Sequence, residues 1–299
     1  MAVKKYTIPK VDDRVTGCFR VSDIIFNRSF KPMEAERMKK LFVPGLFLLM
    51  LMPVLAMAQS PFDGTWKFDM NSLQFPKKPD VYLLQNGMYE CKTCVPPINI
   101  KADGQDQKVT GHPYYDTMSI KVVDDHNVEG TTKRNGKVVG TEKDSISSDG
   151  NALTIDWTDS GQPSGGPQTG KFMMTRVAKG PAGANLLSGS WRAQKAEQST
   201  EAGLTWTFKI NGDEVTMNNP TGQSYTAKLD GTDAPYKGDP GITSVSVKMI
   251  GKTLEETDKR DGKVIGIAKN TISSDGKTLN IVYEDKLHGT TVKGVAQKQ

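Results

Sequence analysis

The sequence predicts an all-β protein built from two tandem antiparallel barrels, with little or no helix after the N-terminal segment. Apolar and polar residues alternate with a period of two wherever the pattern is clear. Residues typical of turns separate these segments at intervals of about 8 to 12 residues, as in all-β sandwiches and barrels. The chain also contains the same hairpin unit twice, which indicates a duplicated module.

The repeated hairpin aligns the two copies. It spans residues 133–140 in the first copy and 259–266 in the second, and a Ser-Ser-Asp-Gly turn follows each, at 147–150 and 273–276. The central Asn-Gly and Asp-Gly pairs tolerate the positive φ of two-residue hairpin turns. The sequence therefore predicts the same strand, turn and strand at both places.

The N-terminal segment predicts export. A basic start at Met38 precedes the apolar run 41–55, and Ala56-Met57-Ala58 matches the small-residue pattern of a signal peptidase site. We therefore expect a signal peptide at 38–58, cleavage before Gln59, and a periplasmic or secreted protein. The apolar run is shorter than the roughly 20 residues of a membrane-spanning helix. Residues 1–37 are interpreted as an over-called start or a disordered leader.

The charge balance changes once this segment is set aside. Residues 1–58 hold 10 of the 39 Lys and Arg residues and 5 of the 34 Asp and Glu residues, which leaves 29 of each sign. The mature chain is formally neutral. Neither a nucleic acid nor an anionic membrane is therefore an expected partner.

The two copies divide the mature chain. The first opens on Gly64-Thr65-Trp66 and the second on Gly189-Ser190-Trp191, with a stretch of small and helix-breaking residues between them. We place β-barrel repeat 1 at 59–178, a linker at 179–185 and β-barrel repeat 2 at 186–299.

Alternation identifies the strands within each copy. Leu204, Trp206, Phe208 and Ile210 share one face, and the faces Leu153/Ile155/Trp157 and Leu279/Ile281/Tyr283 correspond between copies. One buried and one wet face is typical of antiparallel sheets. A sheet with so many strands must hide its edges, so we expect each copy to curl into its own barrel.

One loop distinguishes the copies. The Gly- and Pro-rich segment 159–168 stands where the second copy has only the short connection 284–289. Such a loop could act as a mobile lid over a barrel end. A tolerated insertion is the alternative, because lengthening a surface loop costs little stability.

Cys91 and Cys94 are the only cysteines after the signal peptide. An exported compartment is oxidising, so we expect a disulfide. A redox pair would stand at a helix N-terminus, and a zinc site would need two further ligands. The alignment places the two cysteines opposite Asn218 and Thr221, in a plain turn, which favours a structural staple. We expect no metal and no cofactor.

Catalytic motifs are sparse. The chain lacks a nucleophile elbow, a phosphate-binding loop and a dinucleotide fingerprint. A hydrolase-like site built from His112, Tyr114, Tyr115 and Asp116 is a third functional reading. The second copy carries Asp239 in place of His112, which indicates a turn, so we expect a non-enzyme without catalytic residues.

The Gly-x-Trp sequences at 64–66 and 189–191 resemble the opening of the first strand in lipocalins and related calycin barrels. In that family an Arg at the end of the last strand packs across the Trp and closes the barrel. Arg176 matches that position in the first copy, and the second copy offers Lys293. The chain also resembles uncharacterised secreted bacterial proteins built from such modules, a likeness that implies a fold and no activity.

These observations lead to a hypothesis about function. We expect an exported, non-catalytic binding protein that holds a small hydrophobic ligand in a barrel interior. The residues expected to line it are Trp66, Trp157, Trp206 and Phe208. The alternative is a structural or protein-interaction module of the cell envelope, in which each barrel is filled by its own side chains.

Overall fold

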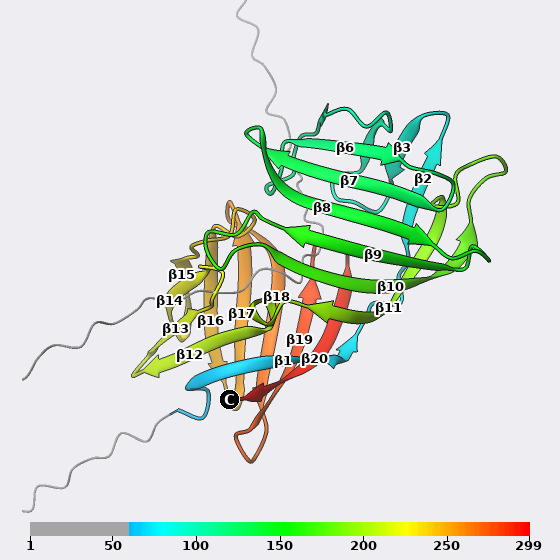
Figure 1. The fold of residues 1–299 in the computed structure, drawn as a ribbon. Coiled ribbons are helices and arrows are strands. Elements are labelled where there is room, and N and C mark those ends of the chain that lie inside the picture. The colour runs from blue at the N-terminus through cyan, green and yellow to red at the C-terminus, as the bar shows by residue number, and fades with distance from the viewer. Residues whose placement is uncertain (1–59) are drawn as a thin grey trace, which may run out of the picture.

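The computed structural model describes residues 60–299 and confirms the all-β prediction. Twenty strands form two ten-stranded antiparallel sheets, and the short 3-10 turn Glu201–Leu204 is the one helical element in this range. Each sheet curls into a nearly closed barrel, and the two barrels lie side by side (Figure 1). The predicted leader, signal peptide and cleavage site lie outside the described residues.

Barrel 1 is the sheet that holds most of the first repeat. In spatial order it contains β4 (Ile98–Lys101), β3 (Met88–Cys91), β2 (Asp80–Gln85), β11 (Gly189–Ser199), β10 (Gln168–Lys179), β9 (Ala152–Asp159), β8 (Lys137–Ile146), β7 (Asn127–Arg134), β6 (Thr117–Val122) and β5 (Gln107–Lys108).

Barrel 2 is the other sheet. In spatial order it contains β14 (Ser224–Lys228), β13 (Glu214–Asn218), β12 (Thr205–Asn211), β1 (Gly64–Gln74), β20 (Thr290–Lys298), β19 (Thr278–Asp285), β18 (Lys263–Ile272), β17 (Thr253–Arg260), β16 (Ser244–Ile250) and β15 (Asp230–Pro235).

The two repeats exchange their first strands. β1 lies between β12 and β20 in barrel 2, where Trp66 pairs with Trp206 and Lys298. β11 takes the matching place in barrel 1, between β2 and β10. The expectation that each repeat builds its own barrel is therefore wrong for one strand of each repeat, β1 and β11. The connection 75–79 contains two prolines, which favour extended backbone over a tight turn and suit a crossing between barrels.

The predicted hairpin turns are confirmed. Asn135 and Gly136 have φ of 51° and 77°, and Asp261 and Gly262 have φ of 49° and 79°. These positive values at both central positions are typical of a type I′ turn. Each hairpin also carries a register shift close to its turn, next to Lys133 and Lys259, so the duplication extends to the irregularity.

Each barrel is closed by a few backbone contacts instead of a full strand pair. In barrel 2, Ser224 and Lys237 exchange two backbone hydrogen bonds of 3.0 and 2.9 Å. In barrel 1, Asp103 bridges to Lys121, and the Gly104 amide donates to the Ile120 carbonyl at 2.9 Å. These contacts cover the sheet edges that would otherwise expose unpaired backbone groups.

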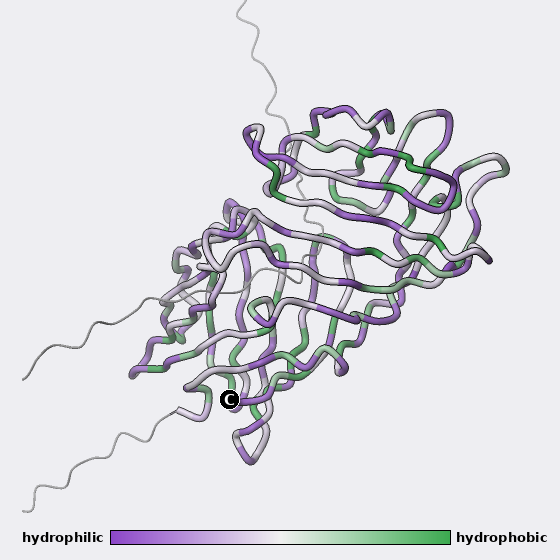
Figure 2. Tube along the Cα trace, in the orientation of Figure 1, coloured by the Kyte–Doolittle hydropathy of each residue, from purple (hydrophilic) through white to green (hydrophobic). Residues whose placement is uncertain are grey.

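A tryptophan anchors the core of each barrel. Trp66 and Trp191 are fully buried, and each indole N–H donates at 2.8 Å to a backbone carbonyl, of Phe62 and Leu187 respectively. Apolar residues alternate with polar ones along the strands (Figure 2), which directs one face of each sheet inward. A buried indole N–H needs a hydrogen-bond acceptor, and both tryptophans have one, so they can pack inside the barrel ends.

A cation stacks on each of these indoles. The Arg176 guanidinium lies 3.9 Å from the ring centroid of Trp191, and the Lys298 ammonium lies 5.3 Å from that of Trp66. Arg176 therefore contacts the tryptophan of the other repeat, because β11 has replaced β1 beside β10. In barrel 2 this place belongs to Lys298 and not to Lys293, because the 159–168 loop is longer than its counterpart at 284–289 and shifts the alignment of the two last strands by that difference.

Candidate functional site

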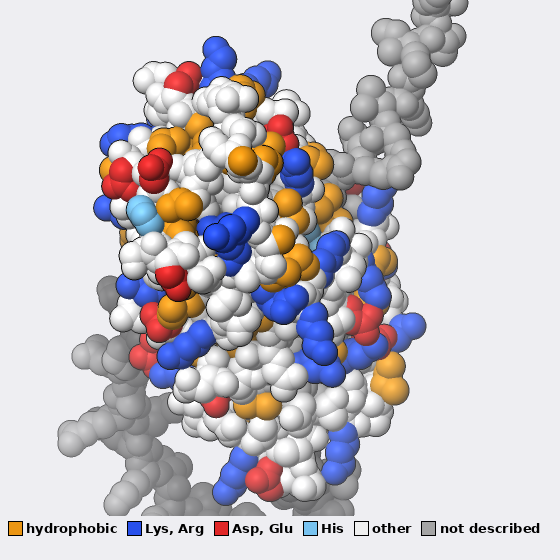
Figure 3. Space-filling view, turned by 90° about the vertical axis from the view of Figure 1, so that its right-hand side faces the viewer, with side chains coloured by type: hydrophobic (Ala, Val, Ile, Leu, Met, Phe, Trp, Pro, Cys, Tyr) orange, Lys and Arg blue, Asp and Glu red, His pale blue; other side chains and the backbone are white. Residues whose placement is uncertain are grey.

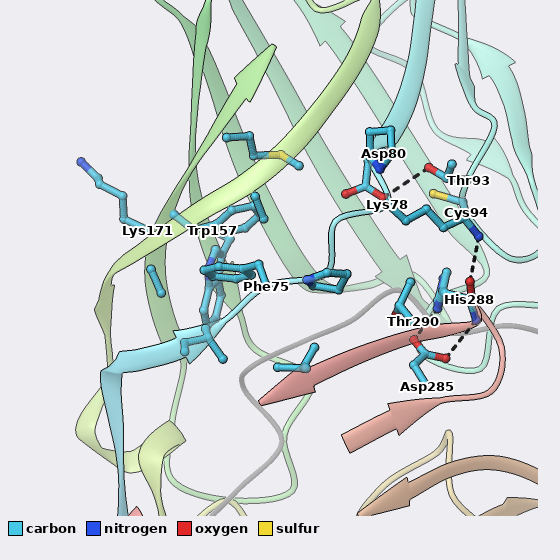
Figure 4. A pocket seen from close by; sticks show the side chains of 18 of the residues that line it. Phe75, Lys78, Asp80, Thr93, Cys94, Trp157, Lys171, Asp285, His288 and Thr290 are labelled. Carbon is cyan, nitrogen blue, oxygen red and sulfur yellow. Dashed lines mark hydrogen bonds and ion pairs between the residues drawn. The ribbon is translucent and has the colours of Figure 1, made fainter. Parts of the chain in front are cut away.

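A cavity of about 230 Å³ opens at the end of barrel 1 that faces barrel 2. Its apolar wall comes from β1, the crossing segment 75–79, β2, β9 and β10 (Figure 4). The principal apolar side chains are Met70, Leu73, Phe75, Tyr82, Trp157, Phe172 and Met174. Tyr82 and Phe172 also pack against the core of barrel 1, so the cavity is the open end of that core.

Local pairing positions Trp157 in the wall. It follows Leu153 and Ile155 on the inward face of β9, and it pairs with Gly170 on β10. A Cβ atom at Gly170 would stand 2.2 Å from the indole ring. The glycine therefore leaves the space in which the Trp157 ring lies against β10.

The corresponding end of barrel 2 carries a stacked aromatic pair. The pairing of Trp191 with Asp80 in barrel 1 matches that of Trp66 with Trp206 in barrel 2. Two residues after each tryptophan, barrel 1 has Ala193 and barrel 2 has Phe68. The Phe68 and Trp206 rings stack with centroids 6.4 Å apart, whereas Ala193 and Asp80 line the cavity. Two differences between the repeats therefore distinguish the barrel end that opens into the cavity from the one that carries the aromatic pair.

Polar groups gather at one side of the cavity. The Thr93 hydroxyl lies 3.4 Å from Asp80 Oδ1, and burial raises the pKa of the Asp80 carboxyl. The Lys78 ammonium donates to the backbone carbonyl of His288 at 2.7 Å, which ties the crossing segment to the β19–β20 turn of barrel 2 (Figure 4). The cavity is therefore amphipathic.

Asp285 and His288 form the turn on the barrel 2 side. Asp285 Oδ1 accepts the backbone amides of Leu287 and His288, and Oδ2 lies 2.6 Å from His288 Nδ1. Repeat 1 builds the same turn with Asp159, which accepts from Gln162 Nε2 at 2.9 Å. Gln162 takes the place of His288 in repeat 1, so the contact between Asp285 and His288 serves to shape the turn. In repeat 2 that turn borders the cavity.

The predicted disulfide is confirmed. The Cys91 and Cys94 sulfur atoms are 2.06 Å apart, and both residues line the cavity. The sequence alignment placed Cys91 opposite Asn218, and the strand register moves it by one position, opposite Met217. Cys91 pairs with Tyr82 in barrel 1, and Met217 pairs with Phe208 in barrel 2. Cys91 thus ends a strand whose counterpart carries Met217, and the turn begins one residue later.

The insertion loop 159–168 packs on barrel 2. The Ser164 amide donates to the Thr221 carbonyl at 3.2 Å, and Pro163 contacts Gly222. Among the described residues, the cavity wall takes none from 160–167. The loop therefore covers the turn that corresponds to the disulfide region of barrel 1, away from the cavity.

The four residues predicted to line a ligand site are dispersed. Trp157 lines the cavity, whereas Trp66 and Phe208 belong to the packed core of barrel 2, and Trp206 packs against that core. Sequence reasoning missed Phe75, which lies on the crossing segment. Its position beside Pro76 signals extended backbone, but only the strand exchange places it over barrel 1.

The segment 112–116 lies elsewhere. His112 stacks on Tyr115 with ring centroids 4.9 Å apart, and burial together with the nearby Arg260 lowers the pKa of its imidazole. The Asp116 oxygens accept from the Asn135 amide at 2.8 Å and the Thr117 hydroxyl at 2.9 Å. Asp116 thus fixes the tip of the repeated hairpin.

Comparison with known protein families finds no matching family, and a search of characterised proteins finds no significant relative. Within residues 60–299, no helix has the length and apolar character needed to cross a membrane, and no group of three or more metal-ligating side chains gathers. On the face drawn in Figure 3, basic and acidic side chains are interspersed. Fold and site together define a pair of barrels that exchange their first strands, with an amphipathic cavity at the end of barrel 1 that faces barrel 2.

Proposed function

We propose that the protein is an exported, non-catalytic binding protein that holds one small amphipathic molecule in the cavity of barrel 1. The observation that carries the proposal is an apolar cavity, continuous with a barrel core, with polar groups on one side. Ligand sites in proteins commonly combine an apolar wall with a few oriented polar groups.

The size of the cavity limits the ligand. Its volume of about 230 Å³ exceeds the roughly 150 Å³ of a cavity known to accept benzene, and it lies below the roughly 300 Å³ at which drug-sized sites begin. A single aromatic ring with a short polar chain fits this range.

The resemblance to lipocalins and calycins supports the same reading. Gly-x-Trp opens β1 and β11, and a cation from the last strand covers each indole. The exchange of first strands departs from the family pattern, so the lipocalin likeness is part of the proposal. Export rests on the basic and apolar pattern of residues 38–58.

Native mass spectrometry of the chain from Gln59, purified gently from its source, tests the proposal. We expect a reproducible excess mass that is lost on denaturation. A complementary assay adds 2-phenylethanol and follows the melting temperature, which should rise because a ligand that binds the folded state stabilises it.

The variant Ala193→Phe supplies the matched test, because it places in barrel 1 the ring that Phe68 provides in barrel 2. We expect it to abolish the thermal shift by 2-phenylethanol while the protein stays folded. Val177→Phe, at an exposed position on the outer face of β10, is the control and should retain the shift. An undiminished shift in Ala193→Phe would place the binding site elsewhere.

A structural or protein-interaction role is the second candidate. The filled end of barrel 2, with Phe68 stacked on Trp206, favours it. That role predicts a bare mass and no thermal shift with any small molecule, so the same experiments separate the two candidates.

A further inference from the structure

We propose that the ligand carries a cationic amine and that the Asp80 carboxylate is its counter-charge. The inference rests on the proposed function and narrows the class of ligand. Three observations carry it: the single long hydrogen bond of Asp80, the engagement of the neighbouring basic groups with acceptors other than Asp80, and the difference between the two repeats at this position.

Asp80 lies at the start of β2, half-buried in the cavity wall. Its hydrogen-bond partner is the Thr93 hydroxyl at 3.4 Å, close to the outer limit for such a bond. The same hydroxyl also accepts the Val81 amide at 3.1 Å. A carboxylate withdrawn from water and given one long hydrogen bond gains from a further donor, and a charged donor gives the shortest and strongest bond.

The basic groups around the cavity already have partners. Lys78 donates to the carbonyl of His288, His288 contacts Asp285, and Lys171 pairs with Asp156 at 3.1 Å. Figure 4 shows the Lys78 ammonium directed away from Asp80, toward the barrel 2 turn. Within residues 60–299, Asp80 is the charged group of the cavity wall that has neither an ion pair nor a short hydrogen bond. The charges of Lys78 and His288 act on it only from a distance, and they offset part of the effect of burial on its pKa.

The aromatic wall suits a cation as well. Phe75, Tyr82 and Trp157 line the same cavity as Asp80. Aromatic faces attract ammonium groups, and the attraction strengthens where water is excluded. A ligand with an aromatic or aliphatic body and an amine head would satisfy both the apolar wall and the carboxylate.

The internal duplication gives an independent argument. The position of Asp80 in barrel 1 is held by Trp206 in barrel 2, where the indole stacks on Phe68. The architecture therefore does not require an acid at this position. A partly buried carboxylate without an ion pair costs stability, so its presence at the open end points to a ligand that compensates it.

Three probes with the same ring test the inference: 2-phenylethylamine, 2-phenylethanol and 3-phenylpropanoate, titrated calorimetrically into the mature chain at neutral pH. We expect the amine to bind about tenfold more tightly than the alcohol, the ratio that a charge-assisted bond contributes, and the carboxylate to bind least. Asp80→Asn should reduce the amine-to-alcohol ratio to about one. Asp213→Asn, an exposed acid in the β12–β13 turn, is the control and should preserve the ratio.

Other outcomes decide against the inference. If the alcohol binds as well as the amine, or the carboxylate binds best, the cationic class is wrong while the proposed binding function stands. If none of the three binds, both fail. Should Asp80→Asn misfold, Lys78→Gln replaces it, because removing that positive charge leaves Asp80 intact and should increase amine affinity about two- to threefold at low salt. Unchanged amine affinity in Lys78→Gln would then overturn the inference.

Discussion

Individual carboxylates inside the barrels show how far the duplication constrains single residues. In barrel 1 Glu142 of β8 faces Gly130 of β7, and in barrel 2 Glu256 of β17 faces Ala268 of β18. These two pairs occupy the same level of the two barrels. Each barrel thus keeps one inward glutamate at this level. In barrel 1 the second strand of the hairpin carries it, and in barrel 2 the first strand does.

An inward aspartate accompanies each glutamate two residues along the same strand. Asp144 and Asp258 are buried, and one oxygen of each has no hydrogen-bond partner within residues 60–299. Tyr225 donates to Glu256 at 2.6 Å. Burial, together with the neighbouring glutamate, raises the pKa of both aspartates. Protonated acids inside a barrel need fewer partners than charged ones, which explains how these oxygens are tolerated.

This burial predicts a pH-dependent stability. A carboxyl whose pKa is raised in the folded state binds a proton where the unfolded chain, with an aspartate pKa of about 3.9, has lost it. The free energy of unfolding therefore falls by about 1.4 kcal/mol per pH unit from about pH 4 until the pKa of the folded state is reached. Asp258→Asn should remove the contribution of Asp258 to this decline, so that the variant gains on the wild type as the pH rises above about 4 in urea unfolding.

Asp275→Asn is the control of opposite sign. Asp275 is exposed, and hydrogen bonds from Ser273 and the Lys277 amide lower its pKa. Its contribution is present above the pKa of the unfolded chain and is lost as pH falls, so this variant should lose most at neutral pH. An Asp258→Asn difference that is constant across the pH range would contradict the assignment.

At the scale of elements, the alternation of side chains predicted where the strands lie and which face of each points inward. It did not predict which strands lie beside one another. The inward faces of β9 and β19 and the two hairpin turns follow from local sequence, because period and turn chemistry are local properties. The exchange of β1 and β11 does not, because both strands open on the same Gly-x-Trp pattern, which does not specify the barrel that receives each strand.

The cavity was beyond prediction for the same reason. It requires Ala193 of β11 to lie near Asp80 of β2, two residues from different repeats that meet only after the exchange. Trp157 was predicted as a lining residue because its inward position is local. The filling of barrel 2 depends on Phe68 reaching Trp206, again across the two repeats.

Phe68→Ala tests the account of the filled barrel end. Phe68 lies over Gly294 and stacks on Trp206, so truncation should leave a void and lower the free energy of unfolding by about 2–3 kcal/mol, below the usual range for a fully buried ring because the residue is half-buried. If the void is accessible, 2-phenylethanol should bind with a stoichiometry of two instead of one. Phe172→Ala, which enlarges the existing cavity, should keep a stoichiometry of one.

At the scale of the whole molecule, the exchange makes the two repeats interdependent. β1 leaves repeat 1 to pair with β12 and β20, and β11 leaves repeat 2 to pair with β2 and β10. Neither repeat alone retains a complete barrel. The cavity shares this dependence, since its wall combines β1, β10, β11 and the β19–β20 turn.

Cutting the linker tests this interdependence on the full chain. A protease recognition sequence inserted at the exposed residues 181–183 divides the protein between β10 and β11. The fragments should stay together at the mass of the whole chain in native mass spectrometry, because separation would require stripping β1 from barrel 2 and β11 from barrel 1. Unfolding in urea should remain a single transition, as expected of one cooperative unit.

Separate elution of the two fragments, or two independent transitions, would contradict the exchange and imply that each repeat encloses its own first strand. The same cut also separates binding from chain connectivity. Because every part of the cavity wall remains in the nicked complex, 2-phenylethanol should raise its melting temperature as in the intact chain. Loss of that shift in a nicked complex whose fragments stay associated would contradict this expectation. It would mean that ligand binding depends on an intact linker.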